Sequence, residues 1–232
     1  MIENWRWLRR AIVNPSLVIA AVLSLAAQAG AESVKPHASL WFDPTQLPSF
    51  IGAVERYLPN PDGRPDRLVF KEGSQIVFPP EVIEAVQRAA PAGQPLVVWG
   101  IRARNAPIIT MLAFAVPDGE ATVLDRFYWR PEHSGQHGGN TLRLGGTVKA
   151  PYFTPQGEVS GAILDDGSVI RVDPAIAVQF KDRFVEKTKL AGEGLGSESQ
   201  LGKAIDAESL GASLEKLQPL PRPDMARPAA RN

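Results

Sequence analysis

The chain contains an internal repeat with a spacing of 94 residues. When the sequence is compared with itself at that offset, positions 52–100 align without a gap with positions 146–194. Ten of the 49 aligned positions are identical, and six of the ten are glycine or proline, the residues that set backbone geometry at turns. These six are Gly52/Gly146, Gly63/Gly157, Gly73/Gly167, Gly100/Gly194, Pro61/Pro155 and Pro80/Pro174. The repeat predicts that one small structural unit occurs twice.

Each unit is expected to contain three strands, a helix and two further strands. The second and third strands form a hairpin closed by a tight turn at 71–73 or 165–167, and Asp-Gly is among the strongest hairpin signals. A proline at 80 or 174 suits the first turn of the helix, where its missing N–H is not needed. The expected elements after the opening strand are 67–71, 75–78, helix 81–90, 95–101 and 108–116 in the first unit, and 161–165, 168–172, helix 175–184, 187–191 and 203–207 in the second.

This order of elements is that of the five-stranded Greek-key OB barrel. The segment 146–180 (GTVKAPYFTPQGEVSGAILDDGSVIRVDPAIAVQF) resembles the small exported bacterial OB-fold proteins in its Gly-Glu turn, Asp-Gly hairpin and proline-started helix. The resemblance implies a fold and transfers no catalytic residue. The first unit matches more loosely, with Arg64 where the second has Glu158. We therefore predict a mainly β protein of two tandem five-stranded OB-like barrels, each with one short helix between strands three and four; an SH3-like barrel is the alternative.

The N-terminus has the pattern of an export signal. Arg6, Arg9 and Arg10 precede an uncharged apolar run at 17–27, and small residues follow it. We predict a signal peptide at 1–31, cleaved after Ala29 or Ala31, and a periplasmic or secreted protein. The general secretory route is favoured, although the paired arginines also fit the twin-arginine pattern. An uncleaved anchor is the alternative, and it would place the protein at a membrane.

The remaining boundaries follow from composition. The first domain is predicted at 38–131, with an extra strand within 120–130, and the second at 141–215. A glycine-rich linker is predicted at 132–140 and a proline-rich disordered tail at 216–232. The glycine-rich stretch 192–202 is expected to be mobile.

Charge and composition restrict the function. The whole chain has 25 basic and 25 acidic residues and no cysteine, so a disulfide framework and cysteine metal sites are excluded. Removal of the predicted signal leaves a slightly acidic protein, and each repeat unit carries one more acidic than basic residue. This is the wrong sign for a protein that grips phosphates.

A search for catalytic and metal-binding patterns finds none. The chain has no nucleophile elbow and no phosphate-binding loop. His133 and His137 lie among glycines and are interpreted as part of the linker, while Asp166 and Asp173 suit a hairpin turn and a helix cap. We predict no catalytic residue, no metal and no cofactor.

Ligand binding is expected on strands two and three, the usual binding face of OB barrels. The residues of this face are Arg67, Val69, Gln75 and Val77 in the first unit and Ser160, Val169 and Arg171 in the second. Three aromatic residues, Tyr57, Trp99 and Tyr152, fall out of phase with their core neighbours, and we expect them to face outward. The side chains of Phe70, Phe78, Phe180 and Phe184 are expected in the cores. The candidate ligand-binding residues are Tyr57, Arg67, Trp99, Arg102, Tyr152 and Arg171.

The sequence therefore predicts a non-catalytic binding or interaction module, with another exported protein or a glycan as its partner. The first alternative is an oligonucleotide-binding OB protein, in which aromatic residues stack on bases. The second is an enzyme that joins acidic residues of both barrels, such as Glu158 and Asp166, because a fold does not determine a function.

Overall fold

The structure is a computed structural model that describes residues 40–127 and 140–221. Both ranges belong to one compact unit, 38–232. The predicted signal peptide and most of the predicted linker lie outside the described residues. Within the two described ranges, no helix is long and apolar enough to cross a membrane.

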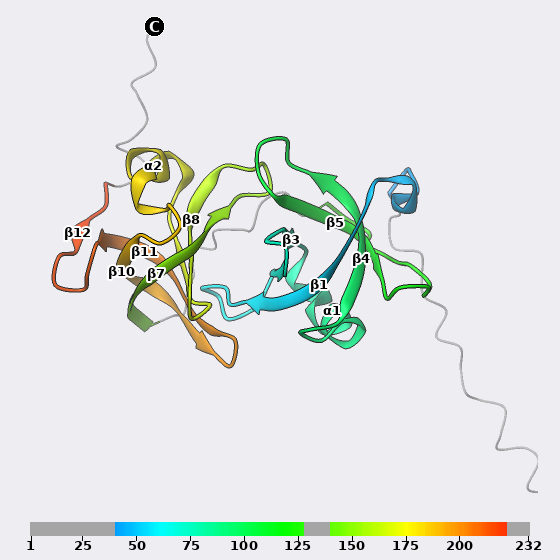
Figure 1. Ribbon diagram of the computed structural model, residues 1–232, viewed down its shortest axis with the longest axis horizontal. Helices are drawn as coiled ribbons and strands as arrows, with labels where there is room; N and C mark the ends of the chain where they lie inside the picture. Colours follow the sequence, from blue (N-terminus) through cyan, green and yellow to red (C-terminus); the bar gives the residue numbers. More distant parts are fainter. Residues whose placement is uncertain (1–39, 128–139, 222–232) are drawn as a thin grey trace, which may run out of the picture. The chain divides into compact units, whose positions relative to one another are not determined.

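The first sheet is built from six strands in the order β3-β2-β1-β4-β5-β6 (Figure 1). β3 also pairs in parallel with β5, and this pairing closes five of the strands into a barrel compatible with an OB-like fold. A short helical segment connects β3 and β4, as the sequence predicts. The elements are η2 (Pro44–Gln46), β1 (Ser49–Leu58), β2 (Arg67–Phe70), β3 (Gln75–Val77), η3 (Pro80–Val82), α1 (Ile83–Ala89), β4 (Pro95–Arg102), β5 (Ile108–Ala115) and β6 (Thr122–Val123).

The second sheet has the order β10-β7-β8-β9-β11-β12, and β10 also pairs with β11. Its helix α2 begins at a proline, and the carboxylate of Asp173 accepts a hydrogen bond from the Ala175 N–H at 2.8 Å. The expected helix cap is confirmed. The elements are β7 (Asn140–Phe153), β8 (Val159–Leu164), β9 (Val169–Arg171), α2 (Pro174–Gln179), η4 (Lys181–Arg183), β10 (Lys189–Ser199), β11 (Gly202–Gly211) and β12 (Gln218–Pro219).

Backbone hydrogen bonds recur at the 94-residue spacing. The N–H of Phe70 donates to the carbonyl of Ser74, and that of Leu164 donates to the carbonyl of Ser168. The turn glycines Gly73 and Gly167 have φ angles of 94° and 90°, a left-handed conformation that glycine adopts without strain. The matched glycines therefore hold matched turns.

Several expectations about the second half and the ends of the domains are wrong. The stretch 192–202 is mostly strand, because β10 pairs with β11 from Ala191 to Ser199 and the two strands satisfy each other's backbone groups. By contrast, the extra strand predicted within 120–130 is confirmed as β6, which pairs with β5. Asn140, expected in the linker, begins β7, and the start of the predicted tail contains β12.

Each sheet encloses its own apolar core. The core of the first contains Phe70 and Phe78, and that of the second contains Phe184, with Phe180 packed against it. The expected core positions of these four phenylalanines are confirmed. Burial of large aromatic side chains supplies much of the driving force for folding in small barrels.

Candidate functional site

The face predicted to bind a ligand is buried. All seven residues of this face are inaccessible to solvent or nearly so. They lie on β2 and β3 of the first sheet and on β8 and β9 of the second. They are covered because the two faces pack against each other. One apolar cluster combines Leu58 and Val69 of the first sheet with Tyr152, Ile163, Val169 and Ala204 of the second. We call this contact the inter-sheet face.

Arg67 is the largest fully buried side chain of the inter-sheet face. Its Nη1 donates to Gln75 Oε1 at 2.6 Å and to the carbonyl of Phe153 at 2.7 Å. Its guanidinium carbon lies 3.8 Å from the centre of the Tyr152 ring, a cation–π geometry. Gln75 in turn donates from Nε2 to the carbonyl of Pro151 at 2.7 Å. Two polar side chains of the first sheet thus bind backbone atoms of β7.

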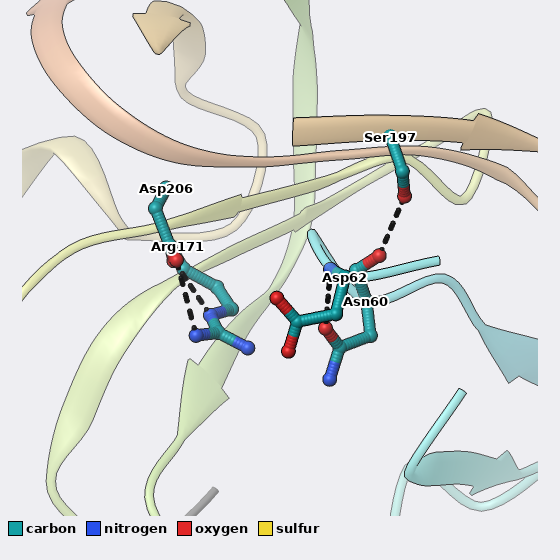
Figure 2. A network of polar contacts seen from close by, with 5 residues as sticks. All are labelled: Asn60, Asp62, Arg171, Ser197 and Asp206. Carbon is teal, nitrogen blue, oxygen red and sulfur yellow. Dashed lines mark hydrogen bonds and ion pairs between the residues drawn. The ribbon is translucent and has the colours of Figure 1, made fainter. Parts of the chain in front are cut away.

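A second polar group lies where the turn after β1 meets β9, β10 and β11 (Figure 2). Arg171 donates to Asp206 through Nε at 2.8 Å and Nη2 at 3.3 Å, a bidentate ion pair. Ser197 Oγ donates to the carbonyl of Asn60 at 2.7 Å, and Asn60 Oδ1 accepts the Asp62 N–H at 2.8 Å. Figure 2 shows the Asp62 carboxylate pointing toward the Arg171 guanidinium. These contacts join the turn of the first half to the second sheet.

Burial and neighbouring charges set the pKa of Arg171. Burial by itself lowers this pKa, but the nearby Tyr152 and Asp206 raise it, and the net direction is upward. The guanidinium therefore stays charged at every accessible pH. A permanently charged arginine with a carboxylate partner serves as a structural ion pair and cannot act as a proton donor or acceptor.

The expected outward exposure of Tyr57 and Tyr152 is wrong, since the two residues are only 5% and 4% exposed. In β1 a bulge between Val54 and Arg56 shifts the alternation of side chains, so that Tyr57 joins the first core and its hydroxyl donates to the Ala90 carbonyl at 2.8 Å. Tyr152 belongs to the inter-sheet cluster and not to the second core, and the first sheet covers it. Burial raises the pKa of both phenols.

The other two candidate residues do not join this group. Trp99 is half-buried on β4, and Arg102 is exposed at the end of that strand. The structure therefore brings together Arg67, Arg171 and Tyr152 on the inter-sheet face, with Tyr57 in the adjoining core. Arg67, Arg171 and Tyr152 can touch a ligand only if the two sheets separate, and Tyr57 lies inside the first core.

The acidic side chains of the described residues do not gather into a metal site. Among the described residues, no group of three or more histidine, cysteine, aspartate or glutamate side chains is placed to hold a metal ion. His133 and His137 lie outside them. Asp166 accepts hydrogen bonds from the Ser168 N–H and hydroxyl at 2.8 and 2.9 Å, which confirms its expected role in the hairpin turn.

A second surface was missed by the sequence analysis. Directly paired residues of antiparallel strands point to the same side of a sheet. On the side of the first sheet away from its core, two rows cross the strands: Ile51–Val97–Ala115, and Ser49–Trp99–Ala113–Val123. Ile51 is 68% exposed and Val123 48% exposed, and Trp99 is half-buried, whereas Val97, Ala113 and Ala115 are buried. We call these two rows the outer apolar face. The apolar run 111–116 was the available signal, because a strand with only one buried face should alternate.

Aromatic side chains gather at the segments that flank this sheet. Trp41 is 92% exposed and packs edge-on against Phe42, with ring centres 5.2 Å apart. Phe42 also contacts Phe127, which follows β6 in the chain, at 5.9 Å. Next in sequence, η2 lies against β4 and β5. The first half therefore presents exposed large apolar groups both on its sheet and on the segment leading into it.

No protein-family model matches this sequence, and no curated protein matches it. Of the two surfaces described above, the inter-sheet face is closed by the chain itself. The outer apolar face is partly open, because Ile51 and Val123 are exposed while its residues on β5 are buried.

Proposed function

We propose that this protein is a non-catalytic, exported binding module of two tandem OB-like barrels, and that its partner is another exported protein. The observation that carries the proposal is the exposed part of the outer apolar face of the first sheet, where Ile51 and Val123 are exposed and Trp99 is half-buried. Exposed apolar side chains grouped on one face mark protein interaction sites more often than scattered ones do.

The corresponding strand pairings support two OB-like units. In the second sheet β7 pairs with β8 and β10, β9 with β8 and β11, and β10 with β11, so each of these strands has two neighbours. The strands β3 (Gln75–Val77) and β9 (Val169–Arg171) coincide at the 94-residue spacing. A parallel pairing joins each of them to a later strand, β3 to β5 and β9 to β11.

The chemistry of the outer apolar face favours a protein over a polyanion. Aromatic residues are enriched at protein interfaces, whereas charged residues are depleted at their centres. An oligonucleotide would need stacked aromatics in a basic groove on strands two and three. In this protein that face is occupied by the other sheet, which counts against the oligonucleotide alternative.

The test uses matched substitutions of equally exposed aliphatic residues. Ile51→Glu places a charge on the outer apolar face, and Val178→Glu does the same on α2, where Val178 is 73% exposed. The tagged proteins are used to capture partners from the exported fraction of the source cells. We expect Ile51→Glu to lose a captured protein that the wild type and Val178→Glu both retain.

Two outcomes would overturn the proposal. Identical capture by all three proteins would remove the outer apolar face as the binding surface. Binding of a single-stranded oligonucleotide that weakens with added salt would instead support the alternative. N-terminal sequencing of the protein from the exported fraction tests location separately, and we expect it to begin after Ala29 or Ala31.

A further inference from the structure

The inter-sheet face has an approximate twofold relation built into one chain. Glu55 and Lys149 occupy equivalent positions, 94 residues apart, and form an ion pair with each other through Oε1 and Nζ. Two other equivalent pairs, Leu58 with Tyr152 and Val69 with Ile163, share the apolar cluster of this face. Equivalent residues that meet in this way lie near the axis of a twofold interface.

Contacts away from this axis occur in reciprocal pairs. A Cβ built on Gly63 would lie 3.7 Å from the Cβ of Ser197, and a Cβ built on Gly157 would lie 3.0 Å from the Cβ of Ala103. Gly157 and Ala103 are the equivalents of Gly63 and Ser197 at the 94-residue spacing. When residue i contacts j, and the equivalent of i contacts the equivalent of j, the surface is self-complementary.

We propose that the Glu55–Lys149 pair restricts pairing at this surface to unlike halves, whether the other half belongs to the same chain or to a second copy. Two first halves would bring Glu55 against Glu55, and two second halves would bring Lys149 against Lys149. Like charges placed opposite each other disfavour an interface and so select partners. Two copies can therefore join only by exchanging halves, with the first half of each bound to the second half of the other.

The surroundings of the pair strengthen this selection. Both side chains are partly buried, so solvent and salt screen them less than fully exposed charges. Arg56 lies close by, with Nε 3.7 Å from Glu55 Oε1. Glu55→Lys therefore gathers three cations, whereas Lys149→Glu leaves two carboxylates beside one cation. We expect Glu55→Lys to be the more destabilising change.

The first experiment measures thermal unfolding of the purified protein with single and double charge reversals. Each single reversal should lower Tm by about 2–4 °C, the shift that a modest loss of stability causes in a chain of this size. The double variant Glu55→Lys/Lys149→Glu restores an opposite pair and should recover most of that shift. Single reversals that leave Tm unchanged would overturn the proposal.

The second experiment tests exchange directly. The Glu55→Lys and Lys149→Glu proteins are unfolded, mixed, refolded together and analysed by light scattering after gel filtration. Exchange of halves between them creates a Lys–Glu pair at both interfaces. The mixture should therefore contain about tenfold more dimer than either variant refolded alone. The wild type should remain a monomer, because pairing within one chain has the advantage of effective concentration.

A matched ion pair supplies the control. Lys203 and Glu198 face each other across β10 and β11 at 3.4 Å, and both belong to the second half. Because both residues lie in the same half, exchange of halves between a Glu198→Lys chain and a Lys203→Glu chain leaves like charges facing each other in both second halves. A mixture of these two variants should form no extra dimer. Equal dimer formation in both mixtures, or none in the first, would overturn the selection by Glu55 and Lys149.

Discussion

The two halves of the molecule have matched turns and a matched parallel strand pairing, and they differ in what they place on their common face. At one pair of equivalent positions the first half has Arg67, a buried cation, and the second has Gly161, which has no side chain. A Cβ at Gly161 would collide with the backbone of β9, with 2.9 Å to the Arg171 Cα. Repeated glycines and prolines set the turns in both halves. The side chains that lie between the halves differ at equivalent positions, and they fit each other as unlike partners.

The largest expected effect comes from removing the buried cation. Arg67→Ala deletes the hydrogen bonds to Gln75 and to the Phe153 carbonyl and leaves a cavity, so we expect a loss of about 3–4 kcal/mol in the free energy of unfolding. Chemical denaturation of the purified protein measures it. Arg102→Ala is the control, because that side chain is exposed and its loss should cost less than about 0.5 kcal/mol. Equal losses would show that the inter-sheet face does not depend on Arg67.

A second prediction compares Gly52 with its equivalent Gly146. A Cβ at Gly52 would lie 2.6 Å from Cγ of Phe70, whereas a Cβ at Gly146 would lie 3.3 Å from Cδ1 of Leu164. Phe70 is rigid and fully buried, so Gly52→Ala should destabilise the protein by about 2–3 kcal/mol and Gly146→Ala by about 1 kcal/mol or less. Denaturant unfolding of both variants gives the two values. The reverse order would contradict the packing described for the two cores.

The buried phenol of Tyr57 makes stability depend on pH at the alkaline end. Burial raises the pKa of Tyr57 in the folded protein, so the unfolded chain loses this proton first, near the ordinary tyrosine pKa of about 10. Stability should therefore be constant between pH 8 and about 9 and fall above about pH 10. Tyr57→Phe should cost about 1 kcal/mol at pH 8, through the lost hydrogen bond to the Ala90 carbonyl, and should flatten the alkaline decline.

Tyr152→Phe is the companion variant for this measurement. Burial raises its pKa as well, so this change should also flatten the alkaline decline. Phenylalanine keeps an aromatic ring beneath Arg67. Unfolding curves at pH 8 and pH 10.5 for both variants measure the contribution of each phenol to the alkaline decline. An alkaline decline that neither change affects would contradict the burial of the two phenols.

The smallest expected effect concerns a turn in which the halves differ. Gly93 and Lys187 are equivalent, and both have positive φ angles, 92° and 68°. A lysine in this conformation is strained, so Lys187→Gly should stabilise the protein by about 0.5–1 kcal/mol, whereas Gly93→Ala should destabilise it by about 1 kcal/mol. The shift in the denaturation midpoint checks both signs. A loss of stability in Lys187→Gly would mean that contacts of the lysine outweigh its backbone strain.

The elements that follow from the sequence are those in which local residue chemistry decides the structure. The hairpin turns at Gly73 and Gly167 and the cap at Asp173 lie where they were predicted, because only neighbouring residues are involved. The prediction for β10, where glycines suggested mobility, was wrong. Gly194 and Gly196 lie against the backbone of β11, where a Cβ at either would come within 2.8 Å of a main-chain Cα atom. Their lack of side chains permits close pairing of strands.

The candidate site also combines features set by local residue chemistry with features set by contacts between distant residues. Four candidate ligand-binding residues, Tyr57, Arg67, Tyr152 and Arg171, were expected at a binding surface, but they face the other half or its adjoining core. The 94-residue repeat and the order of elements follow from the sequence, since turn chemistry and alternation act over a few residues. Which face is closed and which is open was decided only by the tertiary structure. Burial of a surface depends on what packs against it, and residues distant in the chain supply that contact.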